Sequence, residues 1–314
     1  MTTHPSSFVS PRPALSIEGR GGRPSSLVPY LFVLPAFALF LTFSVYSFFY
    51  MSYLSLFEWD GVNPTKVFVG LGNYWSVLAH DPSFWQSFWQ AGSITGLALV
   101  FQNHLALLLA LAVNRRIAFS TMYRTLFFLP PILSEIVVGL IWAWIYDGNY
   151  GVFNEALKAL GLGQFARSWL ADPVTALTAV AVIHMWKGFG WGFVMFLAGL
   201  QTIPHELYEA ATVDGASAWS RFRHITMPLL FPVYVVVVVL TILGTMQIFA
   251  IIMATTQGGP GYHTEVPIKR ILDSMLSSSR YGYACGQGIV FGLILLTVSL
   301  GQLWLSKRSS RAAA

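Results

Sequence analysis

Four stretches of this 314-residue chain contain no Asp, Glu, Lys or Arg, and each is long enough to cross a membrane as a helix. They are residues 24–57, 82–114, 224–264 and 281–306. About 20 helical residues span the hydrocarbon core of a bilayer, and a charged side chain is costly inside it. The chain is therefore expected to cross a membrane at least four times.

Two further apolar stretches, residues 125–146 and 173–205, each contain a single residue of these four charged kinds, Glu135 and Lys187 respectively. Over the whole chain 55% of the residues are hydrophobic and 10% are charged, which is too apolar for an ordinary soluble domain. We therefore predict an all-α integral membrane protein with six transmembrane helices.

The Lys and Arg residues between these stretches predict the orientation, because cytoplasmic loops of membrane proteins carry an excess of them. Eleven lie on the side of both termini and six on the other, with Lys187 inside a span. Both termini are therefore expected in the cytoplasm, and the net charge of +5 follows from this asymmetry rather than from nucleic-acid binding. The eleven are Arg12, Arg20, Arg23, Arg115, Arg116, Arg124, Arg221, Arg223, Lys307, Arg308 and Arg311; the six are Lys66, Lys158, Arg167, Lys269, Arg270 and Arg280.

The chain is expected to consist of one membrane domain with two short tails. Residues 1–26 are rich in Ser, Pro, Gly and Arg and lack hydrophobic periodicity, which predicts a disordered cytoplasmic tail. We place the transmembrane domain at residues 27–307 and a second cytoplasmic tail at residues 308–314. A short helix is predicted near residues 153–160, and the glycines and proline of residues 258–261 forbid continuing the fifth helix.

Residues 202–232 form a polar, helix-prone segment between the fourth and fifth predicted spans. Pro204 suits the first turn of a helix, and Glu209 falls near the positive N-terminal end of that helix. Gly215 can adopt the positive φ of a turn, and a second short helix is predicted to start near Ser217. From the residues alone, the segment is either a solvated connector or an element that seats against another protein.

The order of residue types in this segment resembles the EAA loop of ABC importer permeases, specifically the sugar-permease family related to the membrane subunits of the maltose transporter. The same resemblance is carried by RTLFFLP at residues 124–130, LAGLQTIP at 197–204 and TTQGGPG at 255–261, and it covers roughly residues 27–307. It implies the type I ABC importer permease fold, with residues 202–228 as a cytoplasmic coupling loop. The matching positions of the loop are Glu209, Ala210, Ala211, Asp214, Gly215, Phe222, Ile225 and Pro228.

The resemblance implies a transport subunit rather than an enzyme, namely the permease of an ATP-driven importer that moves a mono- or oligosaccharide by alternating access. Glu209 is expected to meet a basic group of the ATPase, Ala210 and Ala211 to permit close packing, and Asp214 and Gly215 to supply the bend. The chain has no GxxxxGK[ST] phosphate loop, so ATP and Mg are expected on partner subunits and no cofactor on this chain.

The implied partners are a second homologous permease subunit, two ATP-binding cassette subunits and an extracytoplasmic sugar-binding protein, besides membrane lipid and the sugar itself. The implied location is the cytoplasmic membrane of a bacterium or archaeon.

Glu135 and Lys187 need a partner, water or a cavity, because a charge at bilayer depth costs about 3 kcal/mol. They are predicted to face each other across the third and fourth helices, either as an ion pair that fixes the helix register or as part of the solute pathway. The resemblance favours the pathway. It implies that the solute is held at mid-membrane by Pro131, Glu135, His184, Lys187 and Gly188.

The fifth helix offers further candidates for contact with the solute. Thr245 and Ile248 share a face, with Gln247 beside it, and hydroxyl and amide groups suit the hydroxyls of a sugar. Phe249 is a candidate for stacking on a sugar ring. For Thr245 and Gln247, ordinary hydrogen bonding between helices is the alternative interpretation.

Two other functions stay open from the residues. The Glu135 and Lys187 pair also suits a proton relay in an ion-coupled secondary transporter, and Lys187 suits an anionic solute such as a glycerol phosphate. The HELYE string at residues 205–209 lacks the second histidine of a zinc-protease helix, so we expect no metal there. No nucleophile and base pattern of a hydrolase is visible in the sequence.

Overall fold

The computed structural model describes residues 28–115 and 118–312. The tail predicted for residues 1–26 therefore lies outside the described residues. The chain divides into two units, Met1–Tyr50 and Met51–Ala314.

The described part of the first unit is helical. Helix α1 (Val28–Phe40) passes through a π-helical turn, η1 (Leu41–Val45), into α2 (Tyr46–Leu54). Phe40 and Tyr46 keep helical dihedral angles, so the wider turn does not end the helix. Residues Tyr30–Leu54 are long and apolar enough to cross a membrane, as predicted for the first span.

Four of the remaining predicted spans are also continuous apolar helices in the second unit. Each contains at most two Asp, Glu, Lys or Arg residues in its most apolar window, so a membrane crossing needs few charges to be buried. They are Pro82–Val113 (α4 Pro82–Leu97, η2 Ala98–Gln102, α5 Asn103–Val113), Ala176–Gln201 (α9), Ala218–Met246 (α11 Ala218–Arg221, η4 Phe222–Thr226, α12 Met227–Met246) and Tyr281–Trp304 within α15 (Tyr281–Ala312).

The third predicted span is not one helix but two. Helices α6 (Ser120–Ile132) and α7 (Glu135–Ile145) meet at an angle of 97°. Pro130 and Pro131 occupy the last turn of α6, where neither can donate a backbone hydrogen bond. Leu133 and Ser134 then adopt ψ values of 143° and 138°, which end the helix. Counting this bent pair as one span gives the six predicted crossings.

The fifth helix ends earlier than the sequence suggested. Helix α12 stops at Met246, and a separate helix, α13 (Ala250–Thr255), follows after Phe249 adopts φ −144° and ψ −56°. The glycines and proline of residues 258–261 therefore terminate α13 rather than the fifth span. Ile248 and Phe249 lie outside any helix, which corrects the expectations that Ile248 shares a helical face with Thr245 and that Phe249 belongs to the fifth helix.

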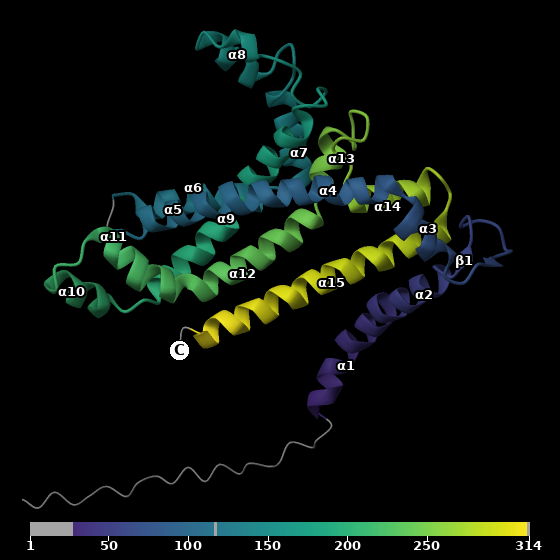
Figure 1. The fold of residues 1–314 in the computed structure, drawn as a ribbon, viewed down its shortest axis with the longest axis horizontal. Coiled ribbons are helices and arrows are strands. Elements are labelled where there is room, and N and C mark those ends of the chain that lie inside the picture. The colour runs from purple at the N-terminus through teal and green to yellow at the C-terminus, as the bar shows by residue number, and fades with distance from the viewer. Residues whose placement is uncertain (1–27, 116–117, 313–314) are drawn as a thin grey trace, which may run out of the picture. The chain divides into compact units, whose positions relative to one another are not determined.

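Helix α9 lies at the centre of the second unit, packed against α5, α6 and α12 (Figure 1). Phe193 and Phe196 of α9 are completely buried in this core. Two glycines allow the close approach: a Cβ on Gly190 would lie 2.4 Å from the carbonyl oxygen of Phe127, and one on Gly199 would lie 2.8 Å from Leu230 Cδ1. The interior is thus built around one helix whose small residues admit its neighbours.

Shorter elements cluster at two ends of this unit (Figure 1). The α14 end holds the antiparallel strands β1 (Phe57–Glu58) and β2 (Val67–Phe68) and the helices α3 (Gly72–His80) and α14 (Pro267–Leu276). The α10 end holds α10 (His205–Val213) and α11. The predicted short helix near residues 153–160 is confirmed as α8 (Val152–Ala159), followed by the 3-10 turn η3 (Gly163–Phe165).

Candidate functional site

A cavity of about 380 Å³ lies between η2, α7, α9 and α12. Its wall is mixed, with charged and amide groups on one part and apolar side chains on the rest, as in many small-molecule sites. The lining residues are Gln102, Glu135, His184, Lys187, Gly188, Trp191, Gly192, Met195, Val237, Leu240, Thr241 and Gly244.

Lys187 and Glu135 meet in this cavity, as the sequence predicted. Lys187 Nζ lies 3.8 Å from Glu135 Oε1, and the two side chains are 14% and 44% exposed. Lys187 Nζ also donates to the carbonyl oxygen of Pro131 at 3.4 Å. The break between α6 and α7 leaves that carbonyl outside the regular helical ladder, so the lysine satisfies both a carboxylate and a free backbone acceptor.

Four of the predicted lining residues border the cavity: Glu135, His184, Lys187 and Gly188. Pro131 is instead buried against α9, where its Cγ would lie 2.6 Å from a Cβ placed on Gly190. It contributes its carbonyl group to Lys187 rather than a wall of the cavity.

The structure does not place the three candidates of the fifth helix on this cavity. Thr245 is completely buried, and its Oγ1 lies 2.7 Å from Oγ1 of Thr95 on α4, which matches the alternative of hydrogen bonding between helices. Gln247 is exposed at the C-terminus of α12, and Phe249 precedes α13.

Sequence reasoning missed several lining residues, among them Gln102 and Trp191. For Gln102 a signal was present, because an amide in the middle of an otherwise apolar span needs a reason to be there. Trp191 carried no such signal, since aromatic residues are common throughout this chain.

The predicted coupling segment forms a solvent-exposed helix, α10, at the α10 end. The side chain of Glu209 is 68% exposed, and its Oε1 lies 3.0 Å from Nδ1 of His205. Ala210 is exposed and Ala211 half-buried. The helix ends at Val213, and Gly215 takes φ +76°, the left-handed conformation expected for the turn after Asp214.

Two contacts attach α10 to the start of the fifth span. The hydroxyls of Tyr208 and Thr226 lie 2.9 Å apart, and Arg221 donates to Thr212 Oγ1 at 2.6 Å. Thr226 is buried, so the Tyr208 contact reaches into the packed part of the chain. Helix α11 begins at Ala218, close to the predicted start near Ser217, and Ser217 caps it by accepting a hydrogen bond at Oγ from the amide of Ser220.

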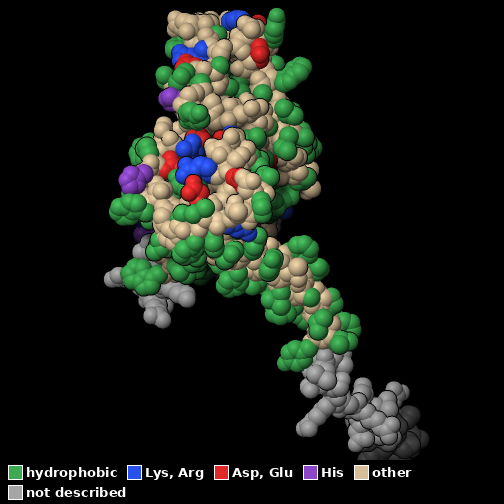
Figure 2. Space-filling model, turned by 90° about the vertical axis from the view of Figure 1, so that its right-hand side faces the viewer, with side chains coloured by type: hydrophobic (Ala, Val, Ile, Leu, Met, Phe, Trp, Pro, Cys, Tyr) green, Lys and Arg blue, Asp and Glu red, His purple; other side chains and the backbone are tan. Residues whose placement is uncertain are grey.

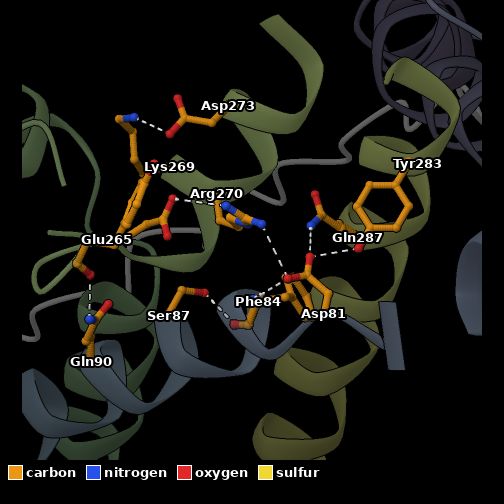
Figure 3. A network of polar contacts seen from close by, with 11 residues as sticks. Asp81, Phe84, Ser87, Gln90, Glu265, Lys269, Arg270, Asp273, Tyr283 and Gln287 are labelled. Carbon is orange, nitrogen blue, oxygen red and sulfur yellow. Dashed lines mark hydrogen bonds and ion pairs between the residues drawn. The ribbon is translucent and has the colours of Figure 1, made fainter. Parts of the chain in front are cut away.

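A second polar cluster lies at the α14 end (Figure 3). Asp81 Oδ1 accepts a bond from the amide of Phe84 and thereby caps α4, while Oδ2 accepts bonds from Tyr283 at 2.7 Å and Gln287 at 3.1 Å. Arg270 of α14 reaches Asp81 at 3.4 Å. Figure 2 looks onto this end and shows acidic and basic side chains lying next to each other.

The carboxylates of this cluster differ in their electrostatics. Burial works against the charge on Asp81, but the hydrogen bonds from Tyr283 and Phe84 and the charge of Arg270 outweigh it, so the pKa of Asp81 lies below its usual value. Burial raises the pKa of Glu265, and Arg270, whose NH1 lies 3.8 Å from Glu265 Oε1, only partly offsets this. The cluster joins three helices, and the described residues contain no group of three His, Cys, Asp or Glu side chains placed to hold a metal ion.

Comparison with known proteins places this architecture among transport proteins. Residues 102–311 match the model of the family described as "Binding-protein-dependent transport system inner membrane component". The match covers both the cavity and the exposed segment at the α10 end.

Two relatives align over most of the chain. The chain is 36% identical to the probable ABC transporter permease protein YurN of Bacillus subtilis, over 89% of this chain and 96% of the relative. It is 32% identical to the trehalose/maltose transport system permease protein MalF of Thermococcus litoralis, over 86% of this chain and 90% of the relative.

The fold is also similar to a chain in the crystal structure of a bacterial ABC transporter involved in the import of alginate. The TM-score is 0.77 at 24% sequence identity, covering 89% of this chain and 95% of the other. At this identity the likeness concerns the fold alone.

Proposed function

The chain belongs to the family of binding-protein-dependent transport system inner membrane components, and from this membership we propose that it is the permease subunit of an ATP-driven sugar importer that works by alternating access. Members of this family are membrane permeases of ABC importers, so the chain is a transport subunit rather than an enzyme. Sugar as the solute is supported by the relative that carries trehalose and maltose in its name.

The observation that carries the proposal is the exposed helix α10, placed between the fourth and fifth spans. An exposed helix joined to a span by the Tyr208–Thr226 contact is suited to transmit a push from outside the membrane to the membrane helices. In this proposal Glu209 meets a basic group of an ATPase, Ala210 and Ala211 admit close packing, and Asp214 and Gly215 form the bend.

The proposed assembly contains a second homologous permease subunit, two ATP-binding cassette subunits and an extracytoplasmic sugar-binding protein. It lies in the cytoplasmic membrane of a bacterium or archaeon, with both termini and the coupling loop of residues 202–228 in the cytoplasm. The membrane domain is proposed at residues 27–307, with tails at residues 1–26 and 308–314. The excess of Lys and Arg on the side of the α10 end supports this orientation.

The cavity is the proposed solute site, with Glu135, His184, Lys187 and Gly188 in its wall. The carbonyl group of Pro131 holds Lys187, while Thr245 acts between helices. Gln247 and Phe249, in the break between α12 and α13, are proposed to meet the solute outside this cavity on its way through the membrane.

An anionic solute such as a glycerol phosphate is the second candidate. Lys187 favours it, because a phosphate could pair with its ammonium group. Glu135 already lies 3.8 Å from that group, so an anion would have to displace it. The neutral sugar is therefore preferred.

Charge reversal at Glu209 tests the proposal. We expect Glu209→Lys, in the importer reconstituted with its partners in proteoliposomes, to lose sugar uptake while the complex still assembles. Glu206→Lys is the matched control, since it reverses a charge in the first turn of the same helix and should retain most of the uptake.

Wild-type uptake by the Glu209→Lys importer would refute the coupling role. Uptake by the isolated chain, driven by a proton gradient without an ATPase, would instead favour an ion-coupled secondary transporter.

A further inference from the structure

Gln102 is a buried amide that the packing of the chain leaves unused. The residue is 6% exposed, yet its Oε1 has no hydrogen-bond partner among the described residues. It ends the π-helical turn η2 in the second span and lines the cavity. Because burying a polar group without a partner destabilises a protein, such a group calls for a reason outside the fold.

Two other buried amides of the same span each use one of their two polar atoms, although Gln90 Oε1 and Asn103 Nδ2 also lack a partner among the described residues. Gln90 donates from Nε2 to the carbonyl oxygen of Tyr262 at 2.6 Å, and Asn103 accepts from Thr241 Oγ1 at 3.0 Å. Both bonds join the span to distant segments, which is the ordinary structural use of an amide between membrane helices. Gln102 is adjacent to Asn103, but within residues 28–115 and 118–312 neither atom of its amide joins the span to another segment.

The position of the Gln102 amide depends on Gly188 of α9. A Cβ on Gly188 would lie 2.7 Å from Oε1 and 2.9 Å from Nε2 of Gln102. Only glycine leaves room for the amide to lie against α9 at the edge of the cavity. The turn η2 and a glycine on the facing helix thus together hold an unpaired amide at the cavity wall.

The remaining polar groups of the cavity indicate what this amide would bind. His184 also has a buried ring nitrogen, Nδ1, without a partner among the described residues. Lys187, in contrast, already faces the carboxylate of Glu135, which balances its charge. The groups of the wall that still lack a partner are therefore the neutral amide of Gln102 and the ring of His184. A primary amide both donates and accepts, which matches a hydroxyl group of an uncharged solute.

We propose that Gln102 is a binding and specificity-determining residue of the cavity, and that its amide takes a hydroxyl group of an uncharged solute. This inference rests on the proposed function, because it assumes that the cavity is the site through which solute passes. It adds a residue on the second span to a wall otherwise built from α7, α9 and α12.

The test uses the whole importer, reconstituted in proteoliposomes with ATP inside, and radiolabelled maltose, trehalose and sn-glycerol 3-phosphate as probes. Gln102→Met is expected to lower the initial rate of sugar uptake about 3- to 10-fold, the effect of losing one hydrogen bond. Its melting temperature should be unchanged or higher, because the substitution removes an unsatisfied buried amide. If an amide has only a structural role, its replacement should lower the melting temperature and leave the preference among the probes unchanged. We expect this result for the control variant Gln90→Met.

Gly188→Ala provides an independent arm. The added Cβ displaces only the flexible end of Gln102, so the fold should persist while uptake falls as in Gln102→Met. In a Gln102→Ala background the space is free, and Gly188→Ala should cause no further loss.

Uptake by Gln102→Met at the wild-type rate would overturn the inference, as would a loss of uptake that follows a fall in its melting temperature. If the wild-type importer took up sn-glycerol 3-phosphate but neither sugar, the inference that the solute is uncharged would be wrong. ATP-dependent uptake of none of the probes by the wild type would instead count against the proposed function itself.

Discussion

Tyr283 donates a hydrogen bond from its hydroxyl to Oδ2 of Asp81 at 2.7 Å, although 202 residues separate the two in the chain. The bond joins the first turn of α15 to the N-terminus of α4, and Arg270 of α14 reaches the same carboxylate. One nearly buried carboxylate therefore fixes two membrane helices and a short connecting helix at the α14 end. This arrangement has direct consequences for stability.

Asp81→Asn is expected to lower the free energy of unfolding by about 2–3 kcal/mol, because it weakens charge-assisted hydrogen bonds and leaves Arg270 without its nearest carboxylate. Asparagine retains the ability to cap α4, so the loss reports on the cluster rather than on the cap. Thermal unfolding in detergent measures the change. Asp60→Asn, which replaces a half-buried carboxylate whose hydrogen bonds lie within its own turn, is the matched control and should melt as the wild type does. Equal melting of the two variants would contradict the role of Asp81.

The same cluster predicts that the protein loses stability at acidic pH. Since the folded-state pKa of Asp81 lies below its ordinary value of 3.8, its contribution is complete above that value and is lost as the pH falls through the lower, folded-state pKa. The melting temperature of the wild type should thus fall more steeply below pH 3.8 than that of Asp81→Asn. Identical pH profiles of the two proteins would rule out this linkage.

Glu265→Gln should change the stability of the protein in the opposite direction to Asp81→Asn. Burial raises the pKa of Glu265, so the protein loses stability as the pH rises from the ordinary value of 4.5 through the higher folded-state pKa, and the ionised carboxylate costs stability rather than adding to it. Arg270 keeps Asp81 as a partner, so we expect Glu265→Gln to leave the melting temperature at pH 7 unchanged or to raise it. A fall of several degrees would show that the pair with Arg270 outweighs the cost of burial.

Tyr208→Phe tests how α10 is connected to the fifth span. The variant removes one hydrogen bond, to Thr226, worth about 1 kcal/mol, without changing the exposed face of α10. We expect less solute transported per ATP hydrolysed by the assembled importer. Thr226→Val should give the same defect, whereas Tyr150→Phe, at an exposed position, should give none. Normal coupling in both Tyr208→Phe and Thr226→Val would show that this contact does not couple α10 to the fifth span.

Gly215→Ala isolates the backbone conformation of the turn after α10. No described residue has an atom within 4 Å of a Cβ placed there, so the cost arises from φ +76° and should be about 1–2 kcal/mol. Gly215→Asn should cost less, because asparagine tolerates this conformation better. Thermal melts combined with uptake measurements would distinguish the two variants. If both variants had the melting temperature and uptake of the wild type, the turn would adapt to a side chain without cost.

The apolar spans and the α10 segment were predictable from the sequence because their signals are local. A charge-free run of sufficient length, a proline before a helix and a glycine at a turn act over a few residues. The Lys187–Glu135 pair could also be predicted, since each of the two is the one Asp, Glu, Lys or Arg residue in its apolar stretch.

Only the tertiary structure decided which polar residues of the spans face the cavity. Thr245 and Gln102 both sit in apolar helices, yet Thr245 meets Thr95, 150 residues away, while Gln102 has no partner among the described residues. Likewise, the prolines of α6 indicated a disturbance, but the 97° bend and the capture of the Pro131 carbonyl by Lys187 depend on α9 packing alongside. The physical reason is that the length and polarity of a span are properties of its own residues, whereas the partner of each side chain depends on how the helices are rotated against one another.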